Sequence, residues 1–228
     1  RKKKLERMDK IPPPPSLEKP TIEFQYKANT VQEVLSVDDL SQAYDDEVIF
    51  SEIDFKLYQG TKAALVGPNG SGKTTLLEII AGLKEGDRGE VKQAKGIKMA
   101  YYDQEHRNLT LDYNLVEELQ KVENLSEGQA RDVLAQFLFK GDEVFKEVAS
   151  LSGGEKARLS LAKLSLQNCN LLLMDEPTNH LDIESKELLQ SALEDYPGTI
   201  LIISHDRYLL DSLAQQIFAL EGSSLVEY

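Results

Sequence analysis

The feature that most constrains this chain is a glycine-rich loop, Gly67–Thr75, which lies between the apolar run Ala63–Val66 and the helical pattern Leu76–Ile80. Its spacing is Gly-x-x-x-x-Gly-Lys-Thr, the pattern of a phosphate-binding loop, and it has the strand and helix that the pattern requires. Glycines let successive backbone N–H groups point at one anion, and the following helix adds the positive end of its dipole. In such a loop Lys73 reaches the β- and γ-phosphates and the Thr74 hydroxyl ligates Mg²⁺. An ordinary glycine-rich turn is the alternative that the flanking strand and helix disfavour.

The composition indicates a folded, acidic domain. The 228 residues suffice for one large domain or two small ones, and a hydrophobic content of 41% allows a sizeable core. Acidic residues outnumber basic ones by 39 to 26, a net charge of −13, which opposes a nucleic-acid-coating surface on the domain as a whole. The single cysteine, Cys169, cannot form an internal disulfide and is expected to be a small buried hydrophobe. No apolar run approaches the roughly 20 residues of a membrane span.

Residues 1–20 differ in character from the rest. Basic side chains are concentrated in the first ten residues, and four successive prolines, Pro12–Pro15, follow them. Proline cannot continue a helix and favours an extended conformation. We therefore expect the end of a basic helix that runs into a stiff linker, with the folded domain at 21–228; a solvated tail is the alternative. Because the chain begins at arginine rather than methionine, we also expect a piece of a longer protein.

The pattern of apolar residues predicts the fold class. Ile22–Tyr26 and Ile53–Leu57 alternate apolar and polar residues, which indicates half-buried antiparallel strands near the N-terminus. Helical spacing then dominates a subdomain at about 109–166. Outside it, strands are expected at 88–91, 97–101, 171–174 and 200–203 and as a terminal pair, and helices after the glycine-rich loop, after residue 152, at 184–194 and from 207. Strands that alternate with helices favour an α/β fold with a mainly parallel sheet covered on both faces.

Two carboxylates, Asp175 and Glu176, follow the apolar run Leu171–Met174. They lie at the carboxyl end of a predicted buried strand, which is where ligands bind in open α/β sheets. Asp175 is expected to hold Mg²⁺ through water, and Glu176 to polarise an attacking water as general base. A lone Asp-Glu pair is usually a solvated turn, but the upstream phosphate loop favours the catalytic role.

A second candidate anion site is Ser152-Gly153-Gly154-Glu155, which opens another predicted helix with the spacing of a capping box. A hydroxyl and bare N–H groups at a helix start can bind an anion. One nucleotide does not obviously need two such sites in one domain, and a well-capped helix is the alternative.

These residues together resemble the nucleotide-binding domain of the ATP-binding cassette (ABC) superfamily over about residues 21–228. Gly67–Thr74 matches the Walker A loop, Leu171–Asp175 the Walker B strand and Leu151–Glu155 the LSGGE signature. The resemblance implies a P-loop ABC ATPase core that binds ATP and Mg²⁺. The residues that it assigns to nucleotide binding are Tyr44, Gly67, Asn69, Gly70, Ser71, Gly72, Lys73, Thr74, Thr75, Ser152, Gly153, Gly154, Glu155 and Asp182.

The resemblance also gives single residues their roles. Gln104 matches the Q-loop glutamine, which touches Mg²⁺ and the attacking water, and His205 matches the switch histidine that contacts the γ-phosphate. Tyr44 matches the aromatic that stacks on adenine, and Asp182 the D-loop aspartate. The implied catalytic residues are Glu176, His205 and Gln104. The implied metal ligands are Thr74, Gln104 and Asp175.

In this family two domains pack head to tail, so that the signature of one closes on the ATP of the other. The resemblance therefore implies a second ABC domain as partner, either the N-terminal cassette of the same protein or another copy of the isolated domain. The implied reaction is hydrolysis of ATP to ADP and phosphate.

The segment Glu176–Asp182, with Asn179-His180 before Leu-Asp, resembles the ABC-F branch, whereas transporter domains more often carry Ser-Ala there. ABC-F proteins are soluble twin-cassette ATPases that act on the ribosome without membrane domains. The resemblance implies a cytoplasmic C-terminal cassette whose linker reaches ribosome, rRNA and tRNA, in a translation factor or a ribosome-protection antibiotic-resistance protein. Two alternatives stay open: the ATPase subunit of an ABC membrane transporter, and a clamp that binds ATP but hydrolyses little.

Overall fold

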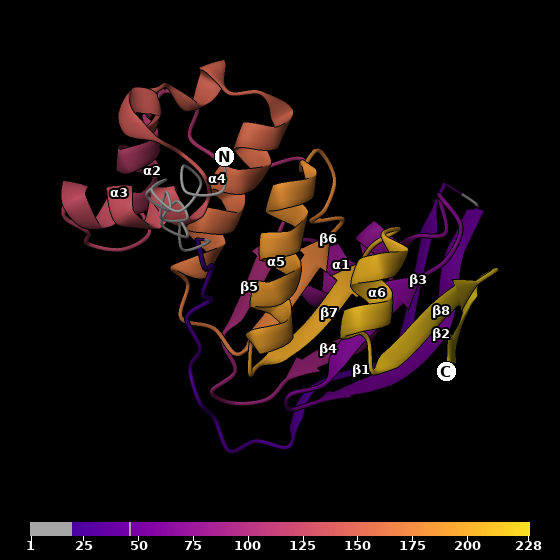
Figure 1. Cartoon of the computed structure of the whole chain (residues 1–228). Coiled ribbons are helices and arrows are strands. Elements are labelled where there is room, and N and C mark those ends of the chain that lie inside the picture. Colours follow the sequence, from indigo (N-terminus) through magenta and orange to yellow (C-terminus); the bar gives the residue numbers. More distant parts are fainter. Residues whose placement is uncertain (1–19, 46) are drawn as a thin grey trace, which may run out of the picture.

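The structure is a computed structural model, and it describes residues 20–45 and 47–228. The linker predicted at 1–20 lies outside the described residues except for Pro20. The main sheet has six strands in the order β5-β6-β7-β3-β8-β9, parallel as far as β8, with β9 antiparallel to it (Figure 1). The strands are β3 (Lys62–Val66), β5 (Met99–Tyr102), β6 (Leu171–Asp175), β7 (Thr199–Ile203), β8 (Gln216–Glu221) and β9 (Ser224–Glu227). The predicted α/β fold with a mainly parallel sheet is confirmed.

A second sheet of three antiparallel strands, ordered β2-β1-β4, lies toward the N-terminal part of the domain. Its strands are β1 (Glu33–Tyr44), β2 (Glu47–Tyr58) and β4 (Arg88–Gln93). The strand expected at Ile53–Leu57 forms part of β2, and the antiparallel N-terminal element is thereby confirmed.

The strand expected at Ile22–Tyr26 is wrong. Ile22 and Phe24 are buried, as their alternation with polar residues predicts, but the segment forms only an isolated bridge between Tyr26 and Cys169. Its backbone bonds instead run to the last residue of a helix and to the chain beyond it: the Gln25 N–H donates to the Ser165 carbonyl over 3.0 Å, and the Lys27 N–H donates to the Cys169 carbonyl over 2.9 Å. Alternation reports burial of one side of an extended chain, and packing on helices satisfies that pattern without a strand partner.

Helices cover both faces of the main sheet. The helices are α1 (Lys73–Ile80), α2 (Leu115–Gln120), α3 (Glu127–Gln136), α4 (Gly153–Ser165), α5 (Ile183–Asp195) and α6 (Arg207–Leu213), with 3₁₀ turns η2 (Gly141–Phe145) and η3 (Val148–Ser150). One core cluster joins α4, α5 and α6 to one face, and the other joins α1 and the three-stranded sheet to the opposite face. Figure 1 shows α5 and α6 together in front of the strands and α2, α3 and α4 gathered at one end.

The central strands explain why this arrangement is stable. Every residue of β6 and β7 is buried, and successive residues such as Leu172 and Leu173 enter opposite core clusters. Full burial of one leucine side chain contributes about 1.5–3 kcal/mol, so these continuous apolar runs hold the sheet between its two layers. Cys169 is 2% exposed, which agrees with its predicted role as a small buried residue.

Caps and one buried ion pair fix the helical region. The capping box expected at Ser152 is present at the N-terminus of α4, and a second one begins α3 at Ser126. Between α4 and α2, the Lys163 ammonium bonds to the Glu118 carboxylate, which is fully buried. In the part of the chain that the structure describes, no helix has the length and apolar character needed to cross a membrane.

Candidate functional site

Four segments that carry predicted site residues lie at one edge of the main sheet. Strands β5, β6, β7 and β3 are neighbours and parallel, so their carboxyl ends share that edge. Gln104 follows β5, Asp175 ends β6, His205 follows β7, and the loop Gly67–Thr75 follows β3. The topology thus brings together segments that are far apart in the sequence, at the place where open α/β sheets bind ligands.

The phosphate loop has the backbone that its glycines permit. Gly72 caps α1 with φ of 93°, and a Cβ there would lie 2.3 Å from Ile49 Cγ2, so another residue would be strained and would displace Ile49. The Lys73 ammonium donates to the carbonyls of Gly67 and Pro68 over 2.9 and 2.8 Å. Burial lowers the pKa of Lys73, while the nearby Asp175 and Glu176 carboxylates oppose the shift. A bound phosphate would give this ammonium a better partner than the loop's own carbonyls.

The residues expected to hold a metal fit a hard divalent cation. Asp175 is 1% exposed and its Oδ1 atom has no hydrogen-bond partner among the described residues. Burial raises the pKa of Asp175, and a hydrogen bond with the Thr74 side chain opposes that rise. Within the described ranges no group of three or more His, Cys, Asp or Glu residues forms a metal site by itself. A Mg²⁺ ion here would therefore depend on Thr74, Asp175 and phosphate oxygens.

Glu176 and His205 lie against each other. The His205 N–H donates to Glu176 Oε2 over 3.3 Å, and His205 Nε2 lies 3.4 Å from Glu176 Oε1. Glu176 is 6% exposed and has a left-handed backbone with φ of 48°, a strained conformation for a residue with a Cβ. Its Oε1 atom has no hydrogen-bond partner among the described residues, so it can still accept a proton from a water molecule.

Tyr44 shares a hollow with the phosphate loop, although it lies far from it in sequence. The tyrosine ends β1 and is 44% exposed. Gln104, which is not among the lining residues, is exposed in the turn after β5. The hollow is open and has a volume of about 300 Å³; its lining residues are Tyr44, Ile49, Gly70, Gly72, Lys73, Thr74 and Thr75. An aromatic ring beside a phosphate loop can stack on the base of a nucleotide whose phosphates the loop binds.

The signature residues lie elsewhere on the chain's surface. Ser152 caps α4: its hydroxyl donates to Glu155 Oε2 over 2.7 Å and its N–H over 2.9 Å. Those two bonds lower the pKa of Glu155 to about 2, and the ion pair with Lys146 contributes to the same shift. None of the residues Ser152–Glu155 lines the hollow at the phosphate loop. The structure therefore separates the two predicted anion sites within one chain.

The sequence pattern did not predict that His180 packs against Gly154. His180 has a left-handed backbone with φ of 63°, and its carbonyl oxygen would lie 2.6 Å from a Cβ placed at Gly154. The glycine is thus required by the packing of the D-loop on the signature helix of the same chain. Asp182 then caps α5 by accepting the Ser185 N–H over 2.8 Å, and that bond lowers the pKa of Asp182. A sequence signal for the His180 contact was absent, because it depends on tertiary packing.

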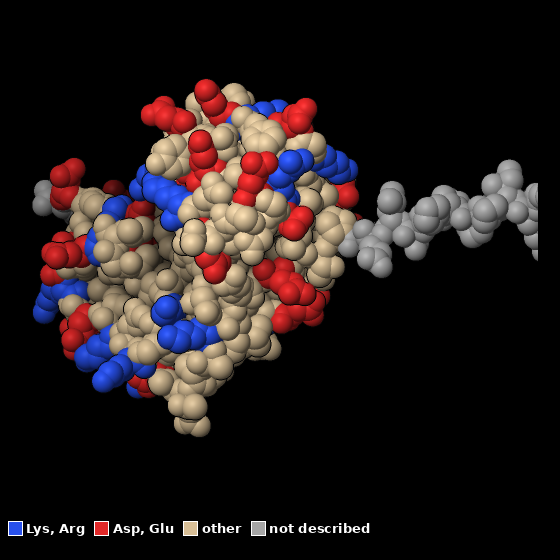
Figure 2. Space-filling view, turned by 90° about the vertical axis from the view of Figure 1, so that its left-hand side faces the viewer, with Lys and Arg blue, Asp and Glu red and all other residues tan. Residues whose placement is uncertain are grey.

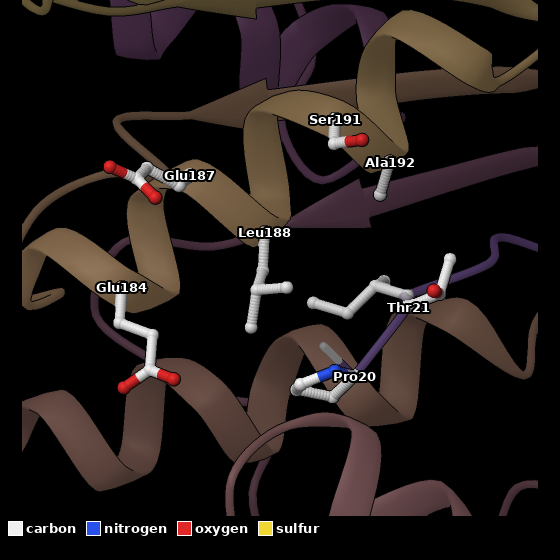
Figure 3. A pocket seen from close by; sticks show the side chains of 8 residues that line it. Pro20, Thr21, Glu184, Glu187, Leu188, Ser191 and Ala192 are labelled. Atoms are coloured by element: carbon white, nitrogen blue, oxygen red, sulfur yellow. The ribbon is translucent and has the colours of Figure 1, made fainter. Parts of the chain in front are cut away.

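A larger hollow, of about 530 Å³, lies between the segment Pro20–Ile22 and α5. Figure 3 shows Leu188 and Ala192 of the helix facing Pro20 and Thr21, with Glu184 and Glu187 to one side. Its lining lacks the phosphate loop and every other predicted site residue. The convergence of anion-binding and acidic groups at the sheet edge, rather than volume, identifies the candidate site.

A sequence family described as "ABC transporter" matches residues 50–179, more than half of the chain. The chain belongs to the ATP-binding cassette family. The predicted ABC ATPase domain, with ATP as its ligand, is thereby confirmed. The matched residues include the phosphate loop, the signature helix and the strand that ends at Asp175.

Relatives of this ABC domain include members of the F branch. The chain is 46% identical to "Putative ATP-binding protein YdiF" of Bacillus subtilis (strain 168), covering 100% of the chain and 36% of that protein. It is 37% identical to "Probable ATP-binding protein YbiT" of Escherichia coli O157:H7, over 93% of the chain and 41% of the relative. It is 34% identical to "ABC transporter F family member 5" of Arabidopsis thaliana, over 99% of the chain and 33% of the relative. The resemblance to the F branch is confirmed, and the chain spans between a third and two fifths of these relatives' lengths.

Solved structures share the fold. The dimeric structure of a post-hydrolysis state of the ATP-binding cassette MJ0796 bound to ADP and Pi superposes with a TM-score of 0.74. It is 20% identical, with coverage of 85% of this chain and 97% of that one. The ATP binding subunit of an ABC transporter gives a TM-score of 0.72 at 24% identity, with coverage of 86% and 89%. At such identities the likeness confirms the predicted ABC core architecture.

Proposed function

We propose that this cassette binds Mg²⁺ and ATP at the edge of its main sheet and hydrolyses the ATP to ADP and phosphate. The observation that carries the proposal is the set of buried oxygens that lack partners among the described residues there. They are Ser71 Oγ, Asp175 Oδ1 and Glu176 Oε1. Buried polar atoms are nearly always paired in folded proteins, so three orphans beside a phosphate loop support a bound ligand.

In the proposed mechanism the chain's own residues orient the nucleotide and a water molecule. Loop N–H groups and Lys73 hold the β- and γ-phosphates, and Tyr44 stacks on the adenine. Glu176 Oε1 orients the water and takes its proton, and His205 beside it contacts the γ-phosphate. Thr74, Asp175 and Gln104 would hold Mg²⁺, which when bound would supply positive charge against the phosphate oxygens.

The separation of Ser152–Glu155 from the phosphate loop supports a composite site. A second ABC domain would bring its own signature helix to the nucleotide, and the signature of this chain would close on the nucleotide of the partner. The partner is the other cassette of a longer protein or a second copy of this chain. That MJ0796 is described as a dimer fits this arrangement. Association would then require ATP, because the nucleotide lies between the two domains.

We further propose that the whole protein acts on the ribosome in the cytoplasm, as a translation factor or a ribosome-protection antibiotic-resistance protein. The support is the Asn179-His180 pattern, the F-branch relatives, and relatives' lengths that leave room for a second cassette. Figure 2 shows basic and acidic side chains interspersed on one face. Because the chain carries a net charge of −13 and its basic cluster lies within the first ten residues, we assign RNA contact to the basic segment within 1–20. The domain proper is 21–228, with its helical subdomain at about 109–166.

Co-sedimentation tests the ribosome proposal. The full-length protein with Glu176→Gln in each cassette, in ATP, should pellet with ribosomes and not with membrane vesicles. The matched control carries Lys73→Ala and its counterpart, which should abolish ATP binding and leave the protein in the supernatant. Pelleting with membranes would instead favour the ATPase subunit of a transporter. If the protein pellets with ribosomes in ATP but the parental protein does not hydrolyse ATP, the result would favour a clamp that binds ATP and hydrolyses little.

A further inference from the structure

Glu78 is a buried carboxylate in α1, the helix that begins at the phosphate loop, and the site described above does not use it. Its side chain is 4% exposed and its neighbours Leu77 and Ile79 belong to the apolar core. A buried carboxylate is costly unless cations and hydrogen bonds compensate it. Two cations do so: Lys84 Nζ lies 2.6 Å from Oε2, and Arg107 Nη2 lies 3.0 Å from Oε1.

Lys84 connects Glu78 to the adenine end of the candidate site. Its ammonium lies over the ring of Tyr44, 6.0 Å from the ring centroid. Tyr44 ends its strand and is 44% exposed, so part of its side chain is open to a ligand. A cation over one ring face leaves the other face for a base. The Glu78 carboxylate thereby holds the Lys84 ammonium in place, and the ammonium in turn holds the Tyr44 ring.

Arg107 connects Glu78 to the opposite end of the site. Its Nε atom lies 3.2 Å from Asp103 Oδ2, and its backbone N–H donates to the same oxygen over 3.1 Å. Nε also lies 3.0 Å from Glu105 Oε2. These contacts close the short loop from 103 to 107, which contains Gln104, and the bond to Glu78 fastens that loop to α1.

We propose that Glu78 is a positioning residue that acts in two directions, on Tyr44 through Lys84 and on Gln104 through Arg107. The inference rests on the proposed function, because it assigns the adenine to Tyr44 and the γ-phosphate and Mg²⁺ end to Gln104. Burial raises the pKa of Glu78, but the bonds from Lys84 and Arg107 outweigh that effect and hold it below its usual value. The carboxylate therefore stays ionised and keeps both cations in place.

The effect of Glu78 on Tyr44 through Lys84 is tested by competition binding. ATP and inorganic tripolyphosphate each displace a fluorescent ATP analogue from the chain, which gives the affinity for each probe. Lys84→Met should weaken ATP about two- to fivefold, the value of one cation–π contact, and leave tripolyphosphate unchanged. The matched control is Lys56→Met, which removes an exposed ion pair of the three-stranded sheet. In that pair Lys56 Nζ lies 2.7 Å from Glu33 Oε2. This control should change neither affinity. Equal weakening of both probes by Lys84→Met would show a merely structural pair and overturn the proposal.

The second direction is tested with Arg107→Met and the Mg²⁺ dependence of ATP affinity. This variant should leave ATP affinity in EDTA unchanged and reduce the gain from Mg²⁺ by about threefold or more. Its matched control is Arg131→Met, which removes the exposed Arg131–Glu127 pair of α3. Glu78→Gln should show both defects together. An unchanged Mg²⁺ gain in Arg107→Met, or a Glu78→Gln variant with native values for both probes, would contradict the proposal.

Two further measurements separate this inference from its premises. Lys73→Ala should lose ATP and tripolyphosphate together; if it binds both normally, the proposed function fails and not only the role of Glu78. Urea unfolding of Glu78→Gln shows whether it folds. If it does not, Lys84→Met and Arg107→Met each still decide one direction, because their cations are 45% and 55% exposed and can be removed without creating a core cavity.

Discussion

Replacing Lys163 by methionine should destabilise the chain by about 3–5 kcal/mol. Its ammonium, on α4, bonds to the fully buried carboxylate of Glu118 on α2 and to the carbonyl of Asn108. In the variant, the one partner that Glu118 keeps among the described residues is the Thr110 N–H, which donates over 3.3 Å. Removing one partner of a buried pair leaves an uncompensated charge, and this accounts for the expected size of the loss.

A double variant separates that penalty from the net value of the pair. Glu118→Gln together with Lys163→Met leaves no buried charge, so the double variant should lose only about 1–2 kcal/mol and be more stable than Lys163→Met alone. Lys95→Met, at an exposed position, is the matched control and should stay within about 0.5 kcal/mol of the parent.

Urea unfolding at neutral pH gives the free energies, with a shared m-value for all four proteins. A loss below about 1 kcal/mol for Lys163→Met would refute the reasoning. So would a double variant no more stable than Lys163→Met, because the penalty would then not come from the stranded charge of Glu118.

Three further outcomes follow from the geometry. Gly154→Ala should reduce turnover in the assembled protein while leaving ATP affinity unchanged, because its methyl group collides with the His180 carbonyl and displaces the signature; equal turnover would contradict that contact. Gly72→Ala, at φ of 93°, should weaken ATP binding, measured by the fluorescent analogue. Glu155 has a pKa of about 2 when folded against 4.5 ordinarily, so its contribution to stability is complete above about pH 4.5 and lost as the pH falls toward 2. The stability advantage of the parent over Glu155→Gln should therefore shrink between about pH 6 and pH 3; a constant difference in unfolding free energy would contradict this.

The sequence predicted the parts of the site that depend on local pattern and strand order. A loop such as Gly67–Thr75 demands a strand before it and a helix after it, and both are present. Asp175 and His205 each follow a continuous apolar strand, and parallel pairing of those strands then places their carboxyl ends together. Alternation failed at Ile22–Tyr26, where an extended segment packs on the core without a strand partner.

Other features of the site depend on tertiary contacts that no local pattern encodes. A glutamate at position 78 within an apolar helix gives no sign that Lys84 and Arg107 converge on it. The requirement for glycine at 154 likewise comes from His180, a residue on another segment. Caps were predictable, since Ser152 and its bonding partner are three residues apart; ion pairs across elements were not.

The most direct test of ATP hydrolysis at this sheet edge is the rate of phosphate release by the assembled protein with Glu176→Gln. We expect ATP affinity within about threefold of the parent, a turnover rate at least about a hundredfold lower, and a closed two-cassette state that persists in ATP. The amide keeps the shape of the side chain but cannot take the proton from water. Phosphate release at the parental rate would contradict the assignment of Glu176 as the base, and with it the proposed mechanism of hydrolysis at this sheet edge.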